Sequence, residues 1–201
     1  MFDARLRPII DGPLNAAGRA IARLGIGPNT VTLAGAALGI AAAVAIAQQA
    51  WLVGLALIVA NRLLDGLDGA VARATRMTDF GGYLDIVADF VFYTAIPVGF
   101  AVASPENRLP AACLLAAFAL TGTSFLAFAT LAAKRGLETE AHGRKSFFYS
   151  TGIAEGAETI FVFVLMTVLP SWFVPIAFSY AAICLLTVAQ RSVAAWLLLR
   201  D

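Results

Sequence analysis

Long apolar runs separated by short polar stretches make up most of the chain after Gly25. Several of them reach the roughly 20 residues that a helix needs to cross the hydrocarbon of a bilayer. The pattern predicts six membrane-spanning helices, at about 29–47, 51–73, 80–104, 109–133, 147–169 and 172–199. We therefore expect an all-α integral membrane protein, with one domain over residues 1–201 and a six-helix bundle over residues 29–199.

The first 25 residues form a different kind of segment. Apolar residues such as Leu6, Ile10 and Leu14 are interspersed with four arginines. That mixture is typical of an amphipathic helix lying on a membrane surface, and the prolines at 8 and 13 predict that it is broken. Because no apolar core of a signal peptide is present, we expect no cleavable signal.

Composition supports a membrane protein. The chain is 60% hydrophobic and 13% charged, whereas soluble domains average about 45–50% and about 25%. A net charge of +1 gives no indication of nucleic-acid binding. Cys113 and Cys184 both lie in apolar runs without metal-ligand spacing, so we interpret them as packing residues rather than a disulfide.

The basic residues predict an orientation. With six spans, most of the fourteen lysines and arginines fall on one side of the membrane, whereas Arg108 falls in an opposite loop and Arg62 and Arg191 lie within spans. Loops rich in basic residues stay in the cytoplasm. We therefore expect both termini, and the turn that follows Arg73, to face the cytoplasm.

Four aspartates interrupt two of the apolar helices: Asp65, Asp68, Asp85 and Asp89. One ionised carboxylate in a membrane helix costs about 2.5–3.5 kcal/mol on insertion scales. Asp65 and Asp68 are spaced i,i+3 and Asp85 and Asp89 are spaced i,i+4, so each pair shares a helix face. Because a short turn joins the two helices, we expect all four carboxylates to converge on one cavity just below the cytoplasmic surface.

Converging carboxylates repel one another unless a cation lies between them. Oxygen-only ligands suit Mg²⁺ or Mn²⁺, and one or two such ions would neutralise a pyrophosphate. Structural ion pairs are the alternative, which we disfavour because the acids outnumber the nearby bases. Gly69 and Gly81 suit a close approach of backbone to ligand; for Gly66 and Gly82, close packing of helices explains a glycine equally well.

The motif resembles that of a known family. Asp65-x-x-Asp68-Gly69-x-x-Ala72-Arg73, followed after seven residues by Gly81-x-x-x-Asp85-x-x-x-Asp89, matches every defining position of the CDP-alcohol phosphotransferase signature. The likeness extends to the chain length, the six spans and the Pro28-Asn29-x-x-Thr32 entry to the first of them. Residues 61–93 and 145–158 also look like a small bacterial branch of that family.

The resemblance implies a homodimer of six-helix protomers in the bacterial inner membrane, with a polar cavity open to the cytoplasm. It implies that Mg²⁺ or Mn²⁺ binds the four aspartates and that Asp89 also acts as the catalytic base. The residues that it places against the CDP moiety are Asn29, Thr32, Asp65, Gly69, Ala72, Arg73 and Gly81.

The function that we expect is transfer of a phosphatidyl group from CDP-diacylglycerol to a small polar alcohol, with release of CMP, in phospholipid biosynthesis. One alternative is the transfer of phosphocholine or phosphoethanolamine from its CDP ester to diacylglycerol. Another is a divalent-cation or proton transporter. Transporter sites usually lie near the midplane within repeats, whereas these acids lie near one surface and no repeat is visible.

A second polar group predicts an acceptor site. In relatives that accept a phosphorylated alcohol, basic residues from the regions of Arg135, Lys145 and Arg191 hold the acceptor's phosphate. The same role here would imply a sugar phosphate or glycerol phosphate acceptor, although positive-inside anchoring also explains the loop residues. Glu155 and Glu158 either pair with Arg62 or Arg191, or line the acceptor pocket.

Overall fold

The computed structural model describes residues 3–136 and 152–200, and every regular element within those ranges is a helix. The elements are α1 (Asp3–Arg23), α2 (Pro28–Ala47), α3 (Trp51–Ala74), α4 (Asp79–Ala103), η1 (Pro105–Asn107), α5 (Arg108–Lys134), α6 (Gly156–Val168), η2 (Pro170–Trp172) and α7 (Phe173–Leu199).

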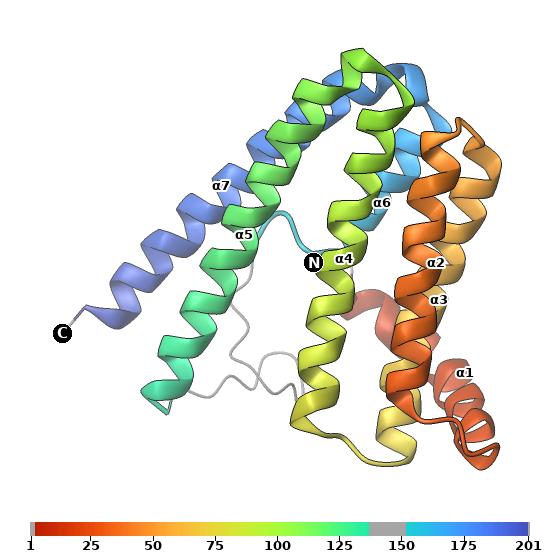
Figure 1. The fold of residues 1–201 in the computed structure, drawn as a ribbon. Helices are drawn as coiled ribbons and strands as arrows, with labels where there is room; N and C mark the ends of the chain where they lie inside the picture. Colours follow the sequence, from red (N-terminus) through yellow and green to blue (C-terminus); the bar gives the residue numbers. More distant parts are fainter. Residues whose placement is uncertain (1–2, 137–151, 201) are drawn as a thin grey trace.

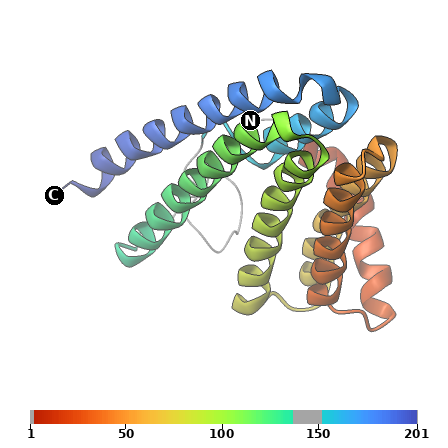
Figure 2. The same ribbon diagram turned by 45° about the horizontal axis from the view of Figure 1, so that its top comes forward.

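The helices form two groups (Figures 1 and 2). In the first, α2 packs against both α3 and α4, and α1 packs along α3. The second is the pair of α5 and α7, which meets the first group near η1 and diverges from it toward the other end (Figure 1). Helix α6 contacts both α3 and α7 and so lies between the groups.

Four helical segments are long and apolar enough to cross a membrane: Pro28–Ala47, Asp79–Ala103, Pro105–Lys134 and Pro170–Leu199. The predicted all-helical membrane architecture is thereby confirmed, but the count of six spans is not. Helix α3 has 24 residues, yet every window of 18 within it contains Arg62, Asp65 and Asp68. Its placement across the bilayer therefore depends on how these charges are compensated.

The fifth predicted span is wrong at its beginning. Residues 152–155 are not helical, and α6 has 13 residues, or about 20 Å of helix against about 30 Å of hydrocarbon. The Gly152 N–H donates to Glu155 Oε1 at 2.9 Å, and the Ala154 N–H donates to Thr187 Oγ1 at 2.9 Å. These side chains satisfy backbone donors without a helical turn; residues 147–151 lie outside the described ranges.

The amphipathic segment is one helix rather than a broken one. Helix α1 continues through both of its prolines and bends along its length (Figure 1), because an internal proline removes one hydrogen bond and kinks a helix without necessarily ending it. At the start of α2, Pro28 is the first helical residue and Gly27 precedes it as N-cap, so neither Asn29 nor Thr30 caps the helix.

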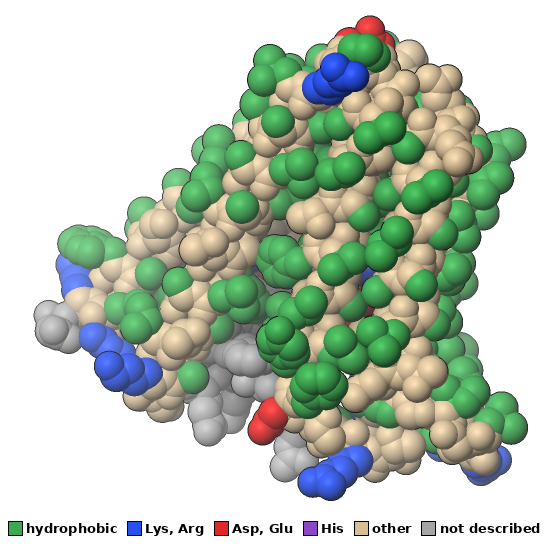
Figure 3. All heavy atoms as spheres, in the orientation of Figure 1, with side chains coloured by type: hydrophobic (Ala, Val, Ile, Leu, Met, Phe, Trp, Pro, Cys, Tyr) green, Lys and Arg blue, Asp and Glu red, His purple; other side chains and the backbone are tan. Residues whose placement is uncertain are grey.

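The surface carries an apolar band between charged ends. On the face drawn in Figure 3, hydrophobic side chains cover the middle of the helices, and Lys, Arg, Asp and Glu side chains gather at the top and along the lower edge. Leu52, Val102 and Leu109 are among the most exposed of the large hydrophobic side chains. Exposed apolar surface of this extent is typical of a protein that lipid surrounds.

Helix α4 joins the two groups through aromatic packing. Its Phe100 ring stacks on Phe173 of α7 with 4.4 Å between centroids, and its Phe92 ring meets Phe163 of α6 edge-to-face at 5.6 Å. On its other side α4 approaches α2 closely, since a Cβ added at Gly99 would lie 2.5 Å from the carbonyl oxygen of Ala43. Such small residues allow membrane helices to pack backbone to backbone.

We expect Gly99→Ala to lower the free energy of unfolding by about 1–3 kcal/mol, because the added methyl would overpack the α2–α4 contact. Gly82→Ala on the same helix is the matched control, since an added Cβ there has no neighbour within 4 Å. It should be neutral or slightly stabilising. Denaturation in detergent measures both, and equal stabilities would refute this account of the contact.

Candidate active site

A narrow cleft of about 10 Å³, roughly the room that one water molecule needs, lies where α2, α3 and α4 meet. The residues that line it are Thr32, Gly35, Ala36, Asn61, Arg62, Asp65, Asp68 and Ala88. Two of the four motif aspartates therefore face the cleft from α3, at the i,i+3 spacing that places them on one helix face.

Asp68 is held by α2. Its Oδ2 accepts a 2.6 Å hydrogen bond from the Thr32 hydroxyl, and both residues are buried. A short hydrogen bond to an ionised carboxylate is about twice as strong as a neutral one. The contact therefore fixes the side chain of Asp68 and ties the beginning of α2 to the motif on α3.

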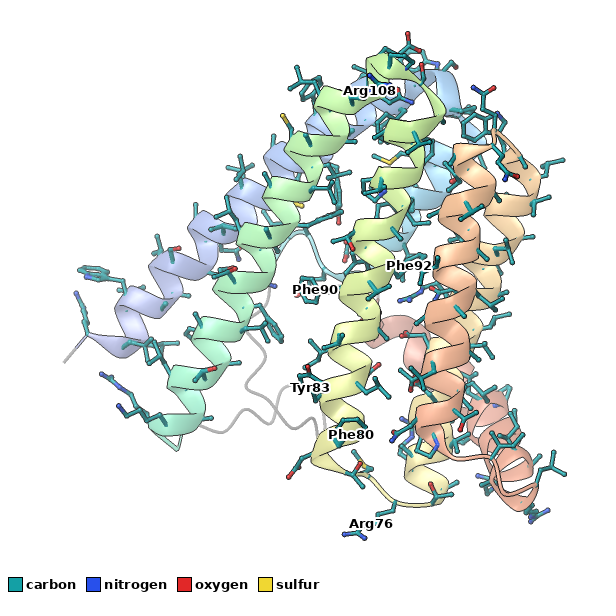
Figure 4. The ribbon with its side chains drawn as sticks, viewed as in Figure 1. Arg76, Phe80, Tyr83, Phe90, Phe92 and Arg108 are labelled. Carbon is teal, nitrogen blue, oxygen red and sulfur yellow. The ribbon has the colours of Figure 1, made fainter. Side chains whose placement is uncertain are left out.

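Asp65 and Asp89 share a cation from the protein itself. Arg62 Nη1 lies 2.9 Å from Asp89 Oδ1 on α4 and 3.5 Å from Asp65 Oδ2. The guanidinium carbon lies 4.3 Å from the centre of the Phe92 ring. In Figure 4, Phe92 lies on the side of α4 toward α2, whereas Phe90 lies on the side toward α5. The ion pair therefore joins α3 to the inner face of α4.

The expected convergence of all four carboxylates on one cavity remains a prediction, and Asp65 interacts electrostatically with Asp68, Asp85 and Asp89. Asp85 is exposed, and among the residues that the structure describes no three Asp, Glu, His or Cys side chains lie close enough to hold a metal ion. In chemical terms the oxygen donors of the motif suit a hard divalent cation. The Arg62 guanidinium lies between Asp65 and Asp89.

Arg73, which the motif assigns to CDP, is positioned by α1. Its Nε and Nη2 donate to Asn15 Oδ1 at 3.2 and 3.1 Å. A Cβ added at Gly69 would lie 3.2 Å from Arg73 Nη1, so this glycine leaves room for the guanidinium. Sequence reasoning missed Asn15, because nothing in a surface helix signals a partner 58 residues away.

The other expected CDP contacts divide between two places. Thr32 and Asp65 line the narrow cleft, whereas Asn29 lines an outer cleft of about 330 Å³. The remaining residues of the outer cleft are Ala22, Gly25, Ile26, Gly27, Pro28, Thr75, Arg76 and Thr78. Asn29 Oδ1 lies 3.5 Å from where a Cβ of Gly81 would be, so the starts of α2 and α4 adjoin. Ala72 is half-buried on α3.

The expected acceptor residues are less closely grouped. Arg191 is 5% exposed on α7; its Nη1 donates to the Thr121 carbonyl of α5 at 3.1 Å, and a Cβ added at Gly152 would lie 3.3 Å from its Nη2. Arg135 instead donates to the carbonyls of Leu198 and Leu199, about 10 Å further along α7. Glu155 precedes α6 and Glu158 lies in its first turn, and Lys145 lies outside the described residues.

Comparison with known proteins decides the family. The family model for CDP-alcohol phosphatidyltransferase matches residues 26–199. The chain belongs to the CDP-alcohol phosphatidyltransferase family. This confirms the resemblance that the aspartate motif predicts, and with it an enzyme that transfers phosphoryl-linked groups.

Two named relatives are similar in sequence to this phosphatidyltransferase. It is 45% identical to the inner membrane protein YnjF of Escherichia coli (strain K12) over 202 residues, which are 100% of this chain and 98% of YnjF. It is 34% identical over 100 residues to the archaetidylinositol phosphate synthase of Pyrococcus horikoshii, covering 49% of this chain and 53% of that protein.

The fold is that of a solved enzyme. The phosphatidylinositol phosphate synthase PgsA1 of Mycobacterium tuberculosis, crystallised with CDP-DAG, superposes with a TM-score of 0.74 at 20% identity, over 91% of this chain and 93% of that one. The same protein in complex with manganese and citrate gives a TM-score of 0.72 at 21% identity, over 91% and 88%. At this level of identity the comparison establishes the fold of the phosphatidyltransferase.

We expect Thr32→Val to lower the free energy of unfolding of this phosphatidyltransferase by about 1–3 kcal/mol, because the buried Asp68 carboxylate would lose its short hydrogen bond. Thr32→Ser retains the hydroxyl and should recover most of the loss. Unfolding in detergent without substrate measures the difference. Equal loss in both variants would show that the methyl group matters rather than the hydrogen bond.

Proposed function

We propose that the enzyme transfers the phosphatidyl group of CDP-diacylglycerol to the hydroxyl of a small polar alcohol and releases CMP. The observation that carries this proposal is the complete signature, with Asp65, Asp68 and Asp89 placed around the meeting point of α2, α3 and α4. The apolar surface around these helices supports a lipid-linked donor. The CDP esters of choline or ethanolamine, with diacylglycerol as acceptor, are the alternative.

In the reaction, the hydroxyl oxygen of the acceptor attacks the β-phosphorus of the donor. A phosphorus–oxygen bond forms there as the anhydride bond to the α-phosphate breaks, and CMP leaves with the electron pair. Asp89 accepts the hydroxyl proton, as its position in the signature implies. In this structure Asp89 Oδ1 accepts a hydrogen bond from Arg62. The proton must therefore go to a carboxylate oxygen of Asp89 that is not bonded to Arg62.

We propose Mg²⁺ or Mn²⁺, as one or two ions, for the cofactor. Asp65, Asp68, Asp85 and Asp89 would hold the metal, which when bound neutralises phosphate charge and makes the acceptor hydroxyl more acidic. Support comes from the oxygen-only donor set and from the crystals of M. tuberculosis PgsA1 with manganese.

The donor headgroup would occupy the two clefts at the ends of α2, α3 and α4. The outer cleft, at about 330 Å³, is at the lower end of the size range of small-molecule sites, and Asn29 on its wall would contact the nucleotide with Gly81 beside it. Arg73, with Gly69 and Ala72 on the same helix, would bind the pyrophosphate. Arginine is well suited to phosphate oxygens because its donors lie in a planar fork.

For the acceptor we propose a phosphorylated alcohol, bound through its phosphate by Arg191. An arginine buried in an apolar bundle marks a functional position by default, and the relatives named above include synthases of inositol phosphate lipids. Glu155 and Glu158 lie on the segment that approaches Arg191 and would contact hydroxyl groups. Arg135 would contribute if its guanidinium turned from the α7 carbonyls toward Arg191, and Lys145 is the other basic residue that we propose for the acceptor's phosphate.

The proposed setting is the bacterial inner membrane, with six spans and both termini in the cytoplasm, and a homodimer as the functional unit. The turn between α3 and α4 then faces the cytoplasm, which is the side on which the water-soluble CMP is released. YnjF is named as an inner membrane protein, which supports this location.

Purified protein with CDP-diacylglycerol and Mg²⁺ should release CMP when the right acceptor is added, and Asp89→Asn should lower that rate at least about 100-fold, the usual worth of general base catalysis. Glycerol phosphate, inositol phosphate, inositol, serine and glycerol form the acceptor panel. Donor binding by the variant should largely persist. Undiminished turnover in Asp89→Asn would exclude the base role, and release only from CDP-choline or CDP-ethanolamine with diacylglycerol would establish the alternative.

Arg191→Lys should raise the KM for a phosphorylated acceptor about tenfold or more, because an ammonium cannot replace the planar fork of a guanidinium on phosphate. The KM for the donor should not change. Ser192→Ala, at the neighbouring exposed position, is the control and should leave both values unaltered. A fall in kcat alone, or equal effects on both substrates, would argue against a phosphate contact.

A further inference from the structure

Arg62 lies in the aspartate cleft, at a position to which the transfer reaction assigns no role. Its Nη1 is 2.9 Å from Asp89 Oδ1 and 3.5 Å from Asp65 Oδ2, and its side chain is only 14% exposed. We propose that Arg62 is a built-in counter-ion, which holds Asp65 and Asp89 together in the metal-free enzyme and releases them when a divalent cation binds. This inference rests on the metal dependence in the proposed function.

The guanidinium is held in place from behind. Its Nε donates to Asn61 Oδ1 at 2.7 Å, and Asn61 Nδ2 in turn donates to the carbonyl of Gly35 on α2 at 2.7 Å. The Phe92 ring covers one face of the group at 4.3 Å. Asn61 and Phe92 are both buried. Asn61 and Phe92 therefore hold the guanidinium so that its Nη groups point at the carboxylates.

A metal ion and Arg62 would compete for the same oxygens. Mg²⁺ binds carboxylate oxygens at 2.0–2.1 Å in near-octahedral geometry, which the 2.9 Å bond between Arg62 and Asp89 Oδ1 obstructs. In the apolar interior the repulsion between guanidinium and divalent ion is also stronger than in water.

A purely structural role for Arg62 gives a different expectation. If Arg62 only links α3 to α4 through its ion pair, it would stabilise the protein equally with and without metal. As a counter-ion it stabilises only the metal-free form, because a bound ion takes over its function. The response of a variant to metal therefore separates the two roles.

The experiment uses the full-length protein in detergent without donor or acceptor. Thermal unfolding of Arg62→Met is measured in EDTA and in saturating Mn²⁺, and Mn²⁺ affinity is measured by electron paramagnetic resonance of the free ion. We expect a lower midpoint than wild type in EDTA and no deficit in Mn²⁺, with the dissociation constant for Mn²⁺ lowered by about tenfold or more. Arg76→Met, an exposed arginine just beyond α3, is the control and should show the same small effect in both conditions.

An equal loss of thermal stability in both conditions would overturn the proposal, as would unchanged or weaker Mn²⁺ binding. Arg62→Lys provides a second test if Arg62→Met does not fold, with an intermediate gain in affinity expected because the ammonium can pair with only part of the cluster. The proposed function can fail separately. If the protein responds to Mn²⁺ as expected but releases no CMP with any donor, the counter-ion role of Arg62 stands and the proposed reaction is excluded.

Discussion

Carboxylates inside an apolar helix bundle must be bonded, paired or coordinated, and the arrangement of α2, α3 and α4 follows from this requirement. The Thr32–Asp68 hydrogen bond joins α2 to α3, the Arg62–Asp89 pair joins α3 to α4, and Asn61 bonds back to the backbone of α2. Every one of these contacts crosses a helix boundary. The polar groups of the proposed site are therefore also the groups that set the register of the three helices.

The second half of the bundle repeats this principle around Arg191, which is buried between α5 and α7 and bonds to a backbone carbonyl. Phe92 of α4 covers the Arg62 guanidinium and packs edge-to-face against Phe163 of α6. Because α4 carries these aromatic contacts and Asp89 together, its position is fixed from both groups of helices.

Much of this architecture could be predicted from sequence, for identifiable reasons. The bounds of α3, α4, α5 and α7 agree with the expected spans to within one or two residues, because long apolar runs and flanking polar residues leave few alternatives. The beginning of α6 could not be predicted, since it depends on bonds from Glu155 and Thr187 to backbone donors that a hydropathy pattern does not contain.

In the site, spacing alone places Asp65 and Asp68 on one face, but it does not reveal which cation meets them. The sequence shows Arg62 as a charge within a span, and its orientation toward Asp89 depends on Asn61 and Phe92, which come together only in the fold.

Helix α1 lies outside every predicted span, yet it packs along α3, which carries the first part of the aspartate motif. A Cβ added at its Gly18 would fall 2.7 Å from Ala70, and its Asn15 bonds the guanidinium of Arg73. Any displacement of this amphipathic helix is therefore transmitted directly to the motif on α3. The placement of a helix outside the bundle thus sets the orientation of the arginine that we propose for phosphate binding.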